Sequence, residues 1–374
     1  MLTIIRNANV FAPEPLGLQD ILIAGGRIEQ IAPAISLSGV AYEEFDAAGQ
    51  IVTPGFIDKH VHVTGGGGEF GFASYAEPVR AEELLGVGTT TVVGLLGTDG
   101  VLKDLHGLYA RVKALDVPMT AYMLTGSYAY PPKTLTGSVD RDIVLIDKVI
   151  GCKLAMSDDR GSFPTESETA RLLTQIRRGA MVTGKCGILH IHLGVLDTYI
   201  DIIESIVRRM PKLLSHISLT HCARDRELFI RCMDYARTGG NLDITTGGSR
   251  FTEPYMAVAI ALENEVPLDR ITFSTDGHGG IRHIDPVTGE ETYGTGPVGG
   301  NLAEIRNLVD NGVLPLDQAL RLVTSTPARE LKLMQKGRLV PGADADLVVF
   351  DSTLRPLAVF AKGTKVANNF VDMD

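Results

Sequence analysis

The chain has 374 residues, of which 44% are hydrophobic and 21% are charged, and its formal net charge at pH 7 is −10. This composition is typical of a globular protein, and an acidic balance without a Lys/Arg cluster argues against a nucleic-acid partner. No apolar run approaches the ~18 residues of a membrane span, and the N-terminus lacks a signal-peptide pattern, so we expect no membrane partner. The four cysteines have no Cys-x-x-Cys spacing, which favours reduced thiols and a cytoplasmic location.

Short β-like segments occur at both ends of the chain. They are residues 2–5, 20–23, 28–31, 346–350 and 357–361. The glycine-containing turn at residues 24–27 predicts a hairpin between the second and third segments. We therefore predict a small β-sandwich domain built from both termini, residues 1–50 plus 337–374. Two unrelated edge hairpins are the alternative.

Between these ends, strand-like and helix-like segments alternate. Apolar strand-like runs begin at residue 51 and recur at residues 89–96, 119–124, 149–156, 188–193, 217–221, 242–246 and 271–275. Amphipathic helical stretches separate them, at residues 166–178, 199–209, 226–237 and 303–311 among others. Eight such units over roughly 280 residues predict an α/β fold, a (β/α)₈ TIM barrel at residues 51–336. An open doubly wound sheet is the alternative, but no Gly-x-Gly-x-x-Gly turn follows the first strand.

Candidate metal ligands follow several of these strands. His60 and His62 end the first run, and because residues i and i+2 of a strand point to one side, both can reach one ion. His192, His221 and Asp276 end the fifth, sixth and eighth runs. A single buried histidine is usually a core residue, but together these side chains lie where a barrel keeps its chemistry. Imidazole and carboxylate without thiolate suit Zn²⁺ or a similar divalent ion.

Lys153 poses a separate question, because it lies among the apolar residues of the fourth predicted strand. A lysine in such surroundings is costly unless it is paired or modified. A salt bridge to a barrel carboxylate is one explanation, and chemical modification of the amine is the other.

Several motifs, taken together, point to a known family. Pro54-Gly55-Phe56-Ile57-Asp58 with His60-Val61-His62, and Pro341-Gly342-Ala343-Asp344-Ala345-Asp346-Leu347, resemble the amidohydrolase superfamily. Within it, the chain resembles the isoaspartyl dipeptidases (β-aspartyl peptidases) over nearly its whole length. The narrower matches are the glycine run at residues 65–69 and the blocks at residues 93–99, 124–128, 136–139, 149–153 and 157–160.

The resemblance implies a binuclear zinc centre. The implied ligands are His60, His62 and Asp276 for one ion, His192 and His221 for the other, and Lys153, carboxylated by CO₂, as the bridge between them. A hydroxide bridging the two ions would attack the substrate. Asp276 would pass its proton to the leaving amine, and Tyr128 would support the tetrahedral oxyanion.

The resemblance also implies how a β-aspartyl dipeptide, with one α-amine and two carboxylates, would be held. Glu69 would pair with the amine, while the backbone at Gly67 and the hydroxyl of Thr98 would help to hold the aspartyl part. Arg160 and Arg224 would take carboxylates, because the planar guanidinium grips a carboxylate at two points.

Two positions, His278 and Gly280, depart from the family pattern. The family block reads Asp-Gly-Asn-Gly-Ser after the eighth strand, and its serine contacts the substrate, whereas this chain has Asp276-Gly277-His278-Gly279-Gly280. Arg250, Arg282 and His283 are candidates to supply the lost contact.

We therefore predict a metal-dependent dipeptidase acting on β-aspartyl dipeptides, and a homo-oligomer, with an octamer as one form that the resemblance implies. Another amidohydrolase, such as an N-acyl-amino-acid hydrolase or a dihydroorotase-like cyclic amidase, is the first alternative. A non-catalytic scaffold is the second, but a scaffold should have lost ligands, and this chain retains all six.

Overall fold

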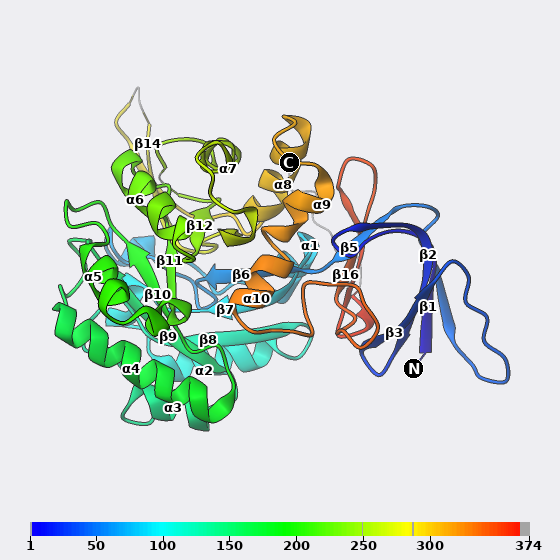
Figure 1. The fold of residues 1–374 in the computed structure, drawn as a ribbon, viewed down its shortest axis with the longest axis horizontal. Coiled ribbons are helices and arrows are strands. Elements are labelled where there is room, and N and C mark those ends of the chain that lie inside the picture. The colour runs from blue at the N-terminus through cyan, green and yellow to red at the C-terminus, as the bar shows by residue number, and fades with distance from the viewer. Residues whose placement is uncertain (1, 249, 286–287, 367–374) are drawn as a thin grey trace.

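The protein is described from a computed structural model, which covers residues 2–248, 250–285 and 288–366 (Figure 1). The last part of the predicted terminal β domain, residues 367–374, lies outside the described residues. The chain forms a barrel with a separate sheet beside it, and that sheet contains the first and the last strands (Figure 1).

The separate sheet has eight strands from both chain ends, in the order β18-β17-β16-β5-β1-β2-β3, with β4 also pairing with β1. They are β1 (Leu2–Phe11), β2 (Pro15–Ala24), β3 (Arg27–Ala32), β4 (Glu43–Asp46), β5 (Ile51–Pro54), β16 (Leu347–Phe350), β17 (Pro356–Ala361) and β18 (Thr364–Lys365). Phe45 on β4 and Phe360 on β17 do not share a strand pair, yet their rings meet edge-on at 5.5 Å. The sheet therefore curls over a core of its own, as expected for a sandwich-like domain.

The first strand of the barrel begins later in the chain than the sequence predicts. Residues 51–54 form β5, which pairs with β1 and β16 in the terminal sheet, and the first barrel strand is β6 (Phe56–Val61). Only Gly55 separates β5 from β6, and a Cβ at Gly55 would lie 2.1 Å from the Thr90 hydroxyl. Both strands are almost entirely buried, and Gly55 lies between Pro54 and Phe56, so no polar residue in the sequence marks their junction. The division of the chain at residues 50 and 337 stays a prediction.

Eight parallel strands form the barrel, which confirms the predicted fold class (Figure 1). After β6 come β7 (Thr89–Gly94), β8 (Thr120–Gly126), β9 (Val149–Met156), β10 (Ile188–Leu193), β11 (Ile217–Thr220), β12 (Leu242–Thr245) and β13 (Ile271–Ser274). Two backbone hydrogen bonds complete the ring. The Cys222 N–H donates to the Asp243 carbonyl at 3.1 Å, and the His62 N–H donates to the Gly277 carbonyl at 2.9 Å.

Helices follow most barrel strands. They are α1 (Ala81–Gly86), α2 (Leu105–Leu115), α3 (Val139–Leu145), α4 (Glu166–Thr183), α5 (Asp201–Arg209), α6 (Arg226–Arg237), α7 (Pro254–Glu263), α8 (Gly300–Asp310), α9 (Leu316–Arg321) and α10 (Ser325–Glu330). Local sequence sets the ends of α4: Thr165 and Glu168 form a capping box, and Gly184 ends the helix with φ 75°. Within the described ranges, no helix has the length and hydropathy to cross a bilayer.

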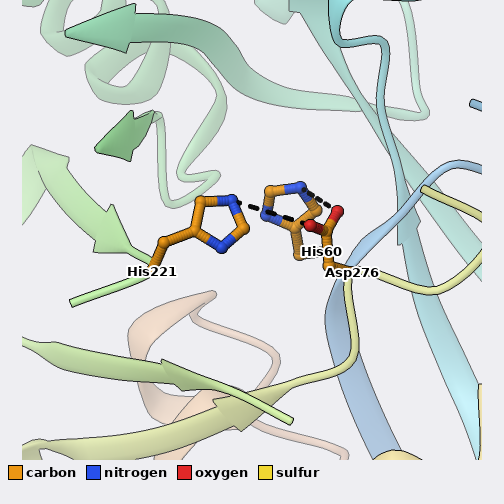
Figure 2. A group of neighbouring side chains, drawn as sticks. All are labelled: His60, His221 and Asp276. Carbon is orange, nitrogen blue, oxygen red and sulfur yellow. Dashed lines mark ion pairs between the residues drawn. The ribbon is translucent and has the colours of Figure 1, made fainter. Parts of the chain in front are cut away.

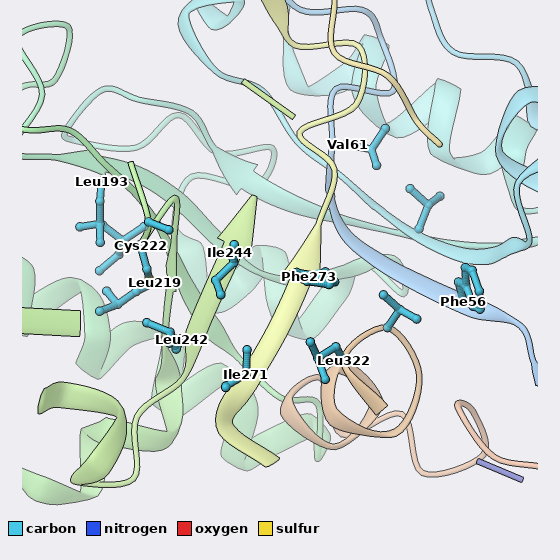
Figure 3. Packing of buried hydrophobic residues seen from close by; sticks show 14 of the residues in the cluster. Phe56, Val61, Leu193, Leu219, Cys222, Leu242, Ile244, Ile271, Phe273 and Leu322 are labelled. Atoms are coloured by element: carbon cyan, nitrogen blue, oxygen red, sulfur yellow. The ribbon is translucent and has the colours of Figure 1, made fainter. Parts of the chain in front are cut away.

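Side chains alternate across the barrel wall. Leu242 and Ile244 of β12 and Ile271 and Phe273 of β13 belong to the apolar cluster that packs outside the strands (Figure 3). Between them, the buried carboxylate of Asp243 accepts hydrogen bonds from three hydroxyl groups, those of Thr220, Thr272 and Ser274, at 2.6–2.7 Å. The carboxylate of Asp243 therefore links β11, β12 and β13 inside the barrel through satisfied hydrogen bonds.

An antiparallel hairpin, β14 (Gly280–Ile284) and β15 (Glu291–Thr295), follows β13 and was not predicted. Its residues are mostly exposed, so no apolar alternation marks it in the sequence. The ring of Tyr293 stacks on the ring of Phe70 with centroids 5.6 Å apart, and the guanidinium of Arg282 lies 5.3 Å from the centroid of the Phe70 ring. These contacts hold the hairpin against the segment that carries Glu69.

Candidate active site

The six predicted metal ligands lie together at the carboxyl ends of five barrel strands. They are His60 and His62 at β6, Lys153 on β9, His192 on β10, His221 after β11 and Asp276 after β13. All are buried except Asp276, whose side chain is 24% exposed and faces a cavity.

The carboxylate of Asp276 is the centre of this cluster. Its Oδ1 lies 3.2 Å from Nε2 of His60, and its Oδ2 lies 3.9 Å from Nε2 of His221 (Figure 2). The same Oδ1 lies 3.2 Å from Nε2 of His62. His60, His221 and Asp276 each offer one ligand atom, and these atoms lie within 4.8 Å of one another. Asp276 has φ 55°, a left-handed conformation that is costly for most residues and that often occurs at functional sites.

The electrostatics of the cluster suit a cation. Burial lowers the pKa of His60 to about 4 and holds the pKa of His192 and His221 well below the ordinary value, so these imidazoles are neutral, the form that binds a metal ion. His62 behaves differently. Burial opposes protonation there, but the carboxylates of Asp276 and Asp99 outweigh it and raise the pKa to about 9. The two carboxylates therefore favour a positive charge on this side of the site.

A buried nitrogen of His221 without a hydrogen-bond partner in the ranges described indicates whether these residues fit a metal ion. Nε2 of His221 is buried, faces Asp276 and has no hydrogen-bond partner among the described residues. Its Nδ1 lies 2.6 Å from the hydroxyl of Thr245, which holds the ring in place. A buried polar atom left unpaired costs about 1–3 kcal/mol, and a bound cation removes that cost. The residues present therefore fit a metal ion.

Lys153 has no carboxylate partner. Among the residues that the structure describes, no carboxylate oxygen lies within 4.0 Å of its Nζ, and the nearest polar side-chain contact is Nε2 of His60 at 3.2 Å. The salt-bridge explanation for this buried lysine therefore fails. Burial lowers the pKa of Lys153 to about 7, so a large part of the amine is neutral, the form that reacts with CO₂.

His192 lies at the edge of the cluster. Its ring is 4.5 Å from that of His221, but its Nε2 contacts Asp158 Oδ2 and Arg224 Nη1, each at 3.0 Å. The hydroxyl of Tyr128 lies 2.6 Å from Nδ1 of His192. Burial raises the pKa of Tyr128, so its hydroxyl stays protonated and can donate a hydrogen bond.

A cavity of about 1040 Å³ opens above the cluster. Its lining includes every predicted substrate residue, namely Gly67, Glu69, Thr98, Tyr128, Arg160 and Arg224, together with Asp276. The Thr98 hydroxyl donates to the Glu69 carboxylate at 3.2 Å. Arg160 pairs with Asp158 at 2.7 Å. Arg250, Arg282 and His283 also line the cavity.

The glycine run at residues 65–68 is required mainly by packing. A Cβ at Gly65 would lie 2.1 Å from the carbonyl oxygen of Ala76, and a Cβ at Gly67 would lie 2.0 Å from that of Ser74. The N–H groups of the other three glycines in the run donate within the protein. The N–H of Gly67 has no such acceptor in the described part of the chain, which leaves it available to a ligand.

His278 and Gly280, the two positions that depart from the family pattern, lie in different surroundings. His278 points away from the cavity: its Nδ1 donates to the Glu77 carbonyl at 2.9 Å, and its Nε2 lies 3.1 Å from the carboxylate of Glu83 on α1. Gly280 packs on the glycine run. A Cβ there would lie 2.8 Å from Cα of Gly67 and 3.1 Å from Oε1 of Glu69.

Serine at position 280 should therefore displace the Glu69 segment, and we expect Gly280→Ser to lower kcat/KM by up to about 10²-fold, the effect of a small misplacement at an active site. Gly294→Ser is the matched control, since a Cβ on that residue of the same hairpin meets its nearest atom at 3.6 Å. Steady-state kinetics of the two variants provides the measurement. A gain in kcat/KM from Gly280→Ser would show instead that this chain has lost a productive contact.

Several partners of the ligands were not predicted. The carboxylate of Asp99 lies 3.7 Å from Nδ1 of His62. Asp158 contacts His192, Thr245 contacts His221, and His190 contacts His60. Only His190 had a signal in the sequence, because it forms a His-x-His pattern with His192.

Comparisons with known proteins show the family of the chain. The amidohydrolase family model matches residues 51–372. A crystal structure of a β-aspartyl dipeptidase from Fervidobacterium islandicum AW-1 in complex with β-Asp-Leu is similar to this chain, with a TM-score of 0.90. The two sequences are 38% identical, and the match covers 98% of this chain and 96% of that chain. A second structure of that enzyme is 37% identical, with a TM-score of 0.91, over 99% and 98%.

A more distant relative is a deacetylase of Agrobacterium fabrum, which is 24% identical over 355 residues, 89% of this chain and 78% of the relative. The family match spans most of the chain, and the two dipeptidase structures share its fold from end to end. The chain belongs to the amidohydrolase family.

Proposed function

We propose that the protein is a metal-dependent dipeptidase that hydrolyses β-aspartyl dipeptides. One observation carries the proposal. A single cavity surrounds Asp276 with a carboxylate for the substrate amine, Glu69, and two guanidinium groups for its carboxylates, Arg160 and Arg224. The similarity over 98% of the chain to a structure that holds β-Asp-Leu supports the same substrate class.

The ligand cluster would hold two divalent ions, which we propose to be Zn²⁺. The residues concerned are His60, His62, Lys153 in its carboxylated form, His192, His221 and Asp276. When bound, the ions would supply activation of water and polarisation of the scissile carbonyl.

The chain's own groups would manage the proton and the developing charge. Asp276 would accept a proton from the attacking water and return it to the leaving amine, because its carboxylate faces both the histidines and the cavity. The protonated hydroxyl of Tyr128 would donate to the tetrahedral oxyanion. The N–H of Gly67 and the hydroxyl of Thr98 would hold the aspartyl part beside Glu69.

A homo-oligomeric state, with an octamer suggested by the resemblance, and a cytoplasmic location stay predictions. Light scattering on the purified protein tests the first.

Reading of the substrate amine by Glu69 gives the sharpest kinetic test. N-succinyl-leucine is β-Asp-Leu without the α-amine, so wild-type enzyme should prefer β-Asp-Leu. Glu69→Gln should lower kcat/KM for β-Asp-Leu by roughly 10- to 100-fold, because a hydrogen bond to a charged group contributes about 1.5–3 kcal/mol. The same substitution should leave N-succinyl-leucine nearly unaffected, and that compound serves as the internal control.

Other outcomes would assign a different activity. A wild-type preference for N-acetyl-leucine would indicate an N-acyl-amino-acid hydrolase, a class made relevant by the deacetylase relative. Turnover of dihydroorotate would indicate a cyclic amidase. A metal-loaded protein that hydrolyses none of these compounds would contradict the dipeptidase and favour a scaffold.

A further inference from the structure

A buried histidine that the proposed reaction does not use lies directly behind the metal site. His190 is on β10, two residues before His192, and its side chain is inaccessible to solvent. Its Nε2 lies 3.0 Å from Nδ1 of His60, and its Nδ1 lies 2.9 Å from the hydroxyl of Ser218 on β11. The rings of His60 and His190 meet edge-on with centroids 5.0 Å apart. Three residues on three strands therefore form one hydrogen-bonded chain.

The far end of this chain determines where its protons lie. Nε2 of His60 faces Oδ1 of Asp276 and Nζ of Lys153, each at 3.2 Å, so Nε2 is the nitrogen presented to the site. A neutral imidazole that offers its lone pair at Nε2 carries its proton at Nδ1. Both rings are enclosed by protein, where an unpaired charge is costly, so a neutral form is favoured for each.

With an ion bound at Nε2 of His60, the proton order would follow. Nδ1–H of His60 would donate to Nε2 of His190, which would accept and therefore carry its own proton on Nδ1. That Nδ1–H would donate to the hydroxyl oxygen of Ser218. Both nitrogens of His190 are thus used, so His190 is not itself a ligand.

We propose that His190, supported by Ser218, is a positioning residue for His60: it selects the Nδ1–H form and holds the ring so that Nε2 points at the first ion. This inference rests on the proposed metal-dependent function. Hydrogen-bond partners of ligand histidines fix the protonated nitrogen and the ring orientation, and their loss typically reduces metal affinity or activity by roughly 10- to 100-fold.

The test measures Zn²⁺ affinity rather than turnover. His190→Phe keeps a planar ring but cannot accept from His60, so one of the two ions should bind roughly 10- to 100-fold more weakly, measured by competition with a chromophoric chelator. His190→Gln can accept through its oxygen and donate through its nitrogen, and it should restore most of the affinity. A packing role alone would not produce this rescue.

His216→Phe is the matched control. His216, on the turn Pro211–His216, is also a buried histidine, with Nδ1 2.6 Å from the carbonyl of Gly187, and it lies outside the site. Its replacement should leave Zn²⁺ affinity unchanged. Ser218→Ala removes only the far partner and should weaken binding in the same direction, by less than His190→Phe.

Several results would overturn the inference. They are wild-type affinity for both ions in a folded His190→Phe protein, glutamine behaving no better than phenylalanine, or unchanged affinity in Ser218→Ala. If His190→Phe does not fold, the Zn²⁺ affinity of Ser218→Ala decides whether His190 positions His60. Failure of the proposed function looks different, because a wild-type protein that binds Zn²⁺ but ignores β-aspartyl dipeptides would refute the dipeptidase and leave the affinity series to judge His190.

Discussion

Lys153→Ala should purify with far less metal than the wild type and should lose activity toward β-Asp-Leu by more than about 10²-fold. The loss of an indirect partner of a ligand already reduces affinity or activity by roughly 10- to 100-fold, and a bridging ligand touches both ions. The structure gives a reason to expect this role. The buried amine of Lys153 has no carboxylate partner in the described chain and lies 3.2 Å from His60. Metal analysis and steady-state kinetics on one preparation check the result.

Chemical rescue separates the bridge from simple damage to the barrel. A short carboxylic acid such as acetate can occupy the space left by Lys153→Ala and supply the missing oxygen atoms, so metal content and activity should partly return. Lys153→Met fills that space and cannot be carboxylated, so it should be inactive and should not respond to acetate. Full activity in Lys153→Ala would contradict the bridging role.

Asp276→Asn should keep most of its metal, while kcat falls by roughly 10²–10⁴-fold, the usual contribution of general acid–base catalysis. Burial opposes ionisation of Asp276, but the neighbouring protonated His62 holds its pKa well below the usual value, so the carboxylate is ionised and can accept a proton at neutral pH. An amide keeps the shape but cannot carry the proton. Because the role belongs to the transition state, kcat and kcat/KM should fall together.

Asp99→Asn is the matched control for this prediction, since Asp99 is a buried carboxylate 3.7 Å from His62 but does not line the cavity. It should reduce activity less, by roughly 10- to 100-fold. If Asp276→Asn retained its metal and a near wild-type kcat, another group would carry the proton. His278 would be a poor candidate, because it contacts Glu77 and Glu83 on the side away from the cavity.

The barrel strands could be predicted because parallel strands are buried on both faces and appear as short apolar runs. The boundary between β5 and β6 could not, since Gly55 interrupts the apolar run without a polar residue. The hairpin β14–β15 is held by contacts of its residues Tyr293 and Arg282 with the ring of Phe70, and no local sequence pattern predicts these contacts. Tertiary packing, and not propensity, determines both features.

The candidate site divides in the same way. The histidines and Asp276 could be predicted because each lies at the end of a strand or just after it, and the barrel brings the carboxyl ends of all its strands to one face. The substrate residues came from the resemblance, and only the folded chain brings Glu69 next to Gly280. The pairing of His190 with His60 depends on how two strands face each other across the barrel, which spacing along one strand does not reveal.

The short junction at Gly55 has a consequence for how the protein holds together. The N–H of Gly55 donates to the carbonyl of Asp346 at 2.9 Å, and β5 pairs along its length with β16, a strand made from the other end of the chain. One residue later β6 begins, and its far end carries His60 and His62. The two ends of the chain thus meet at the base of the strand that carries His60, so loss of the pairing between β5 and β16 should also displace this histidine.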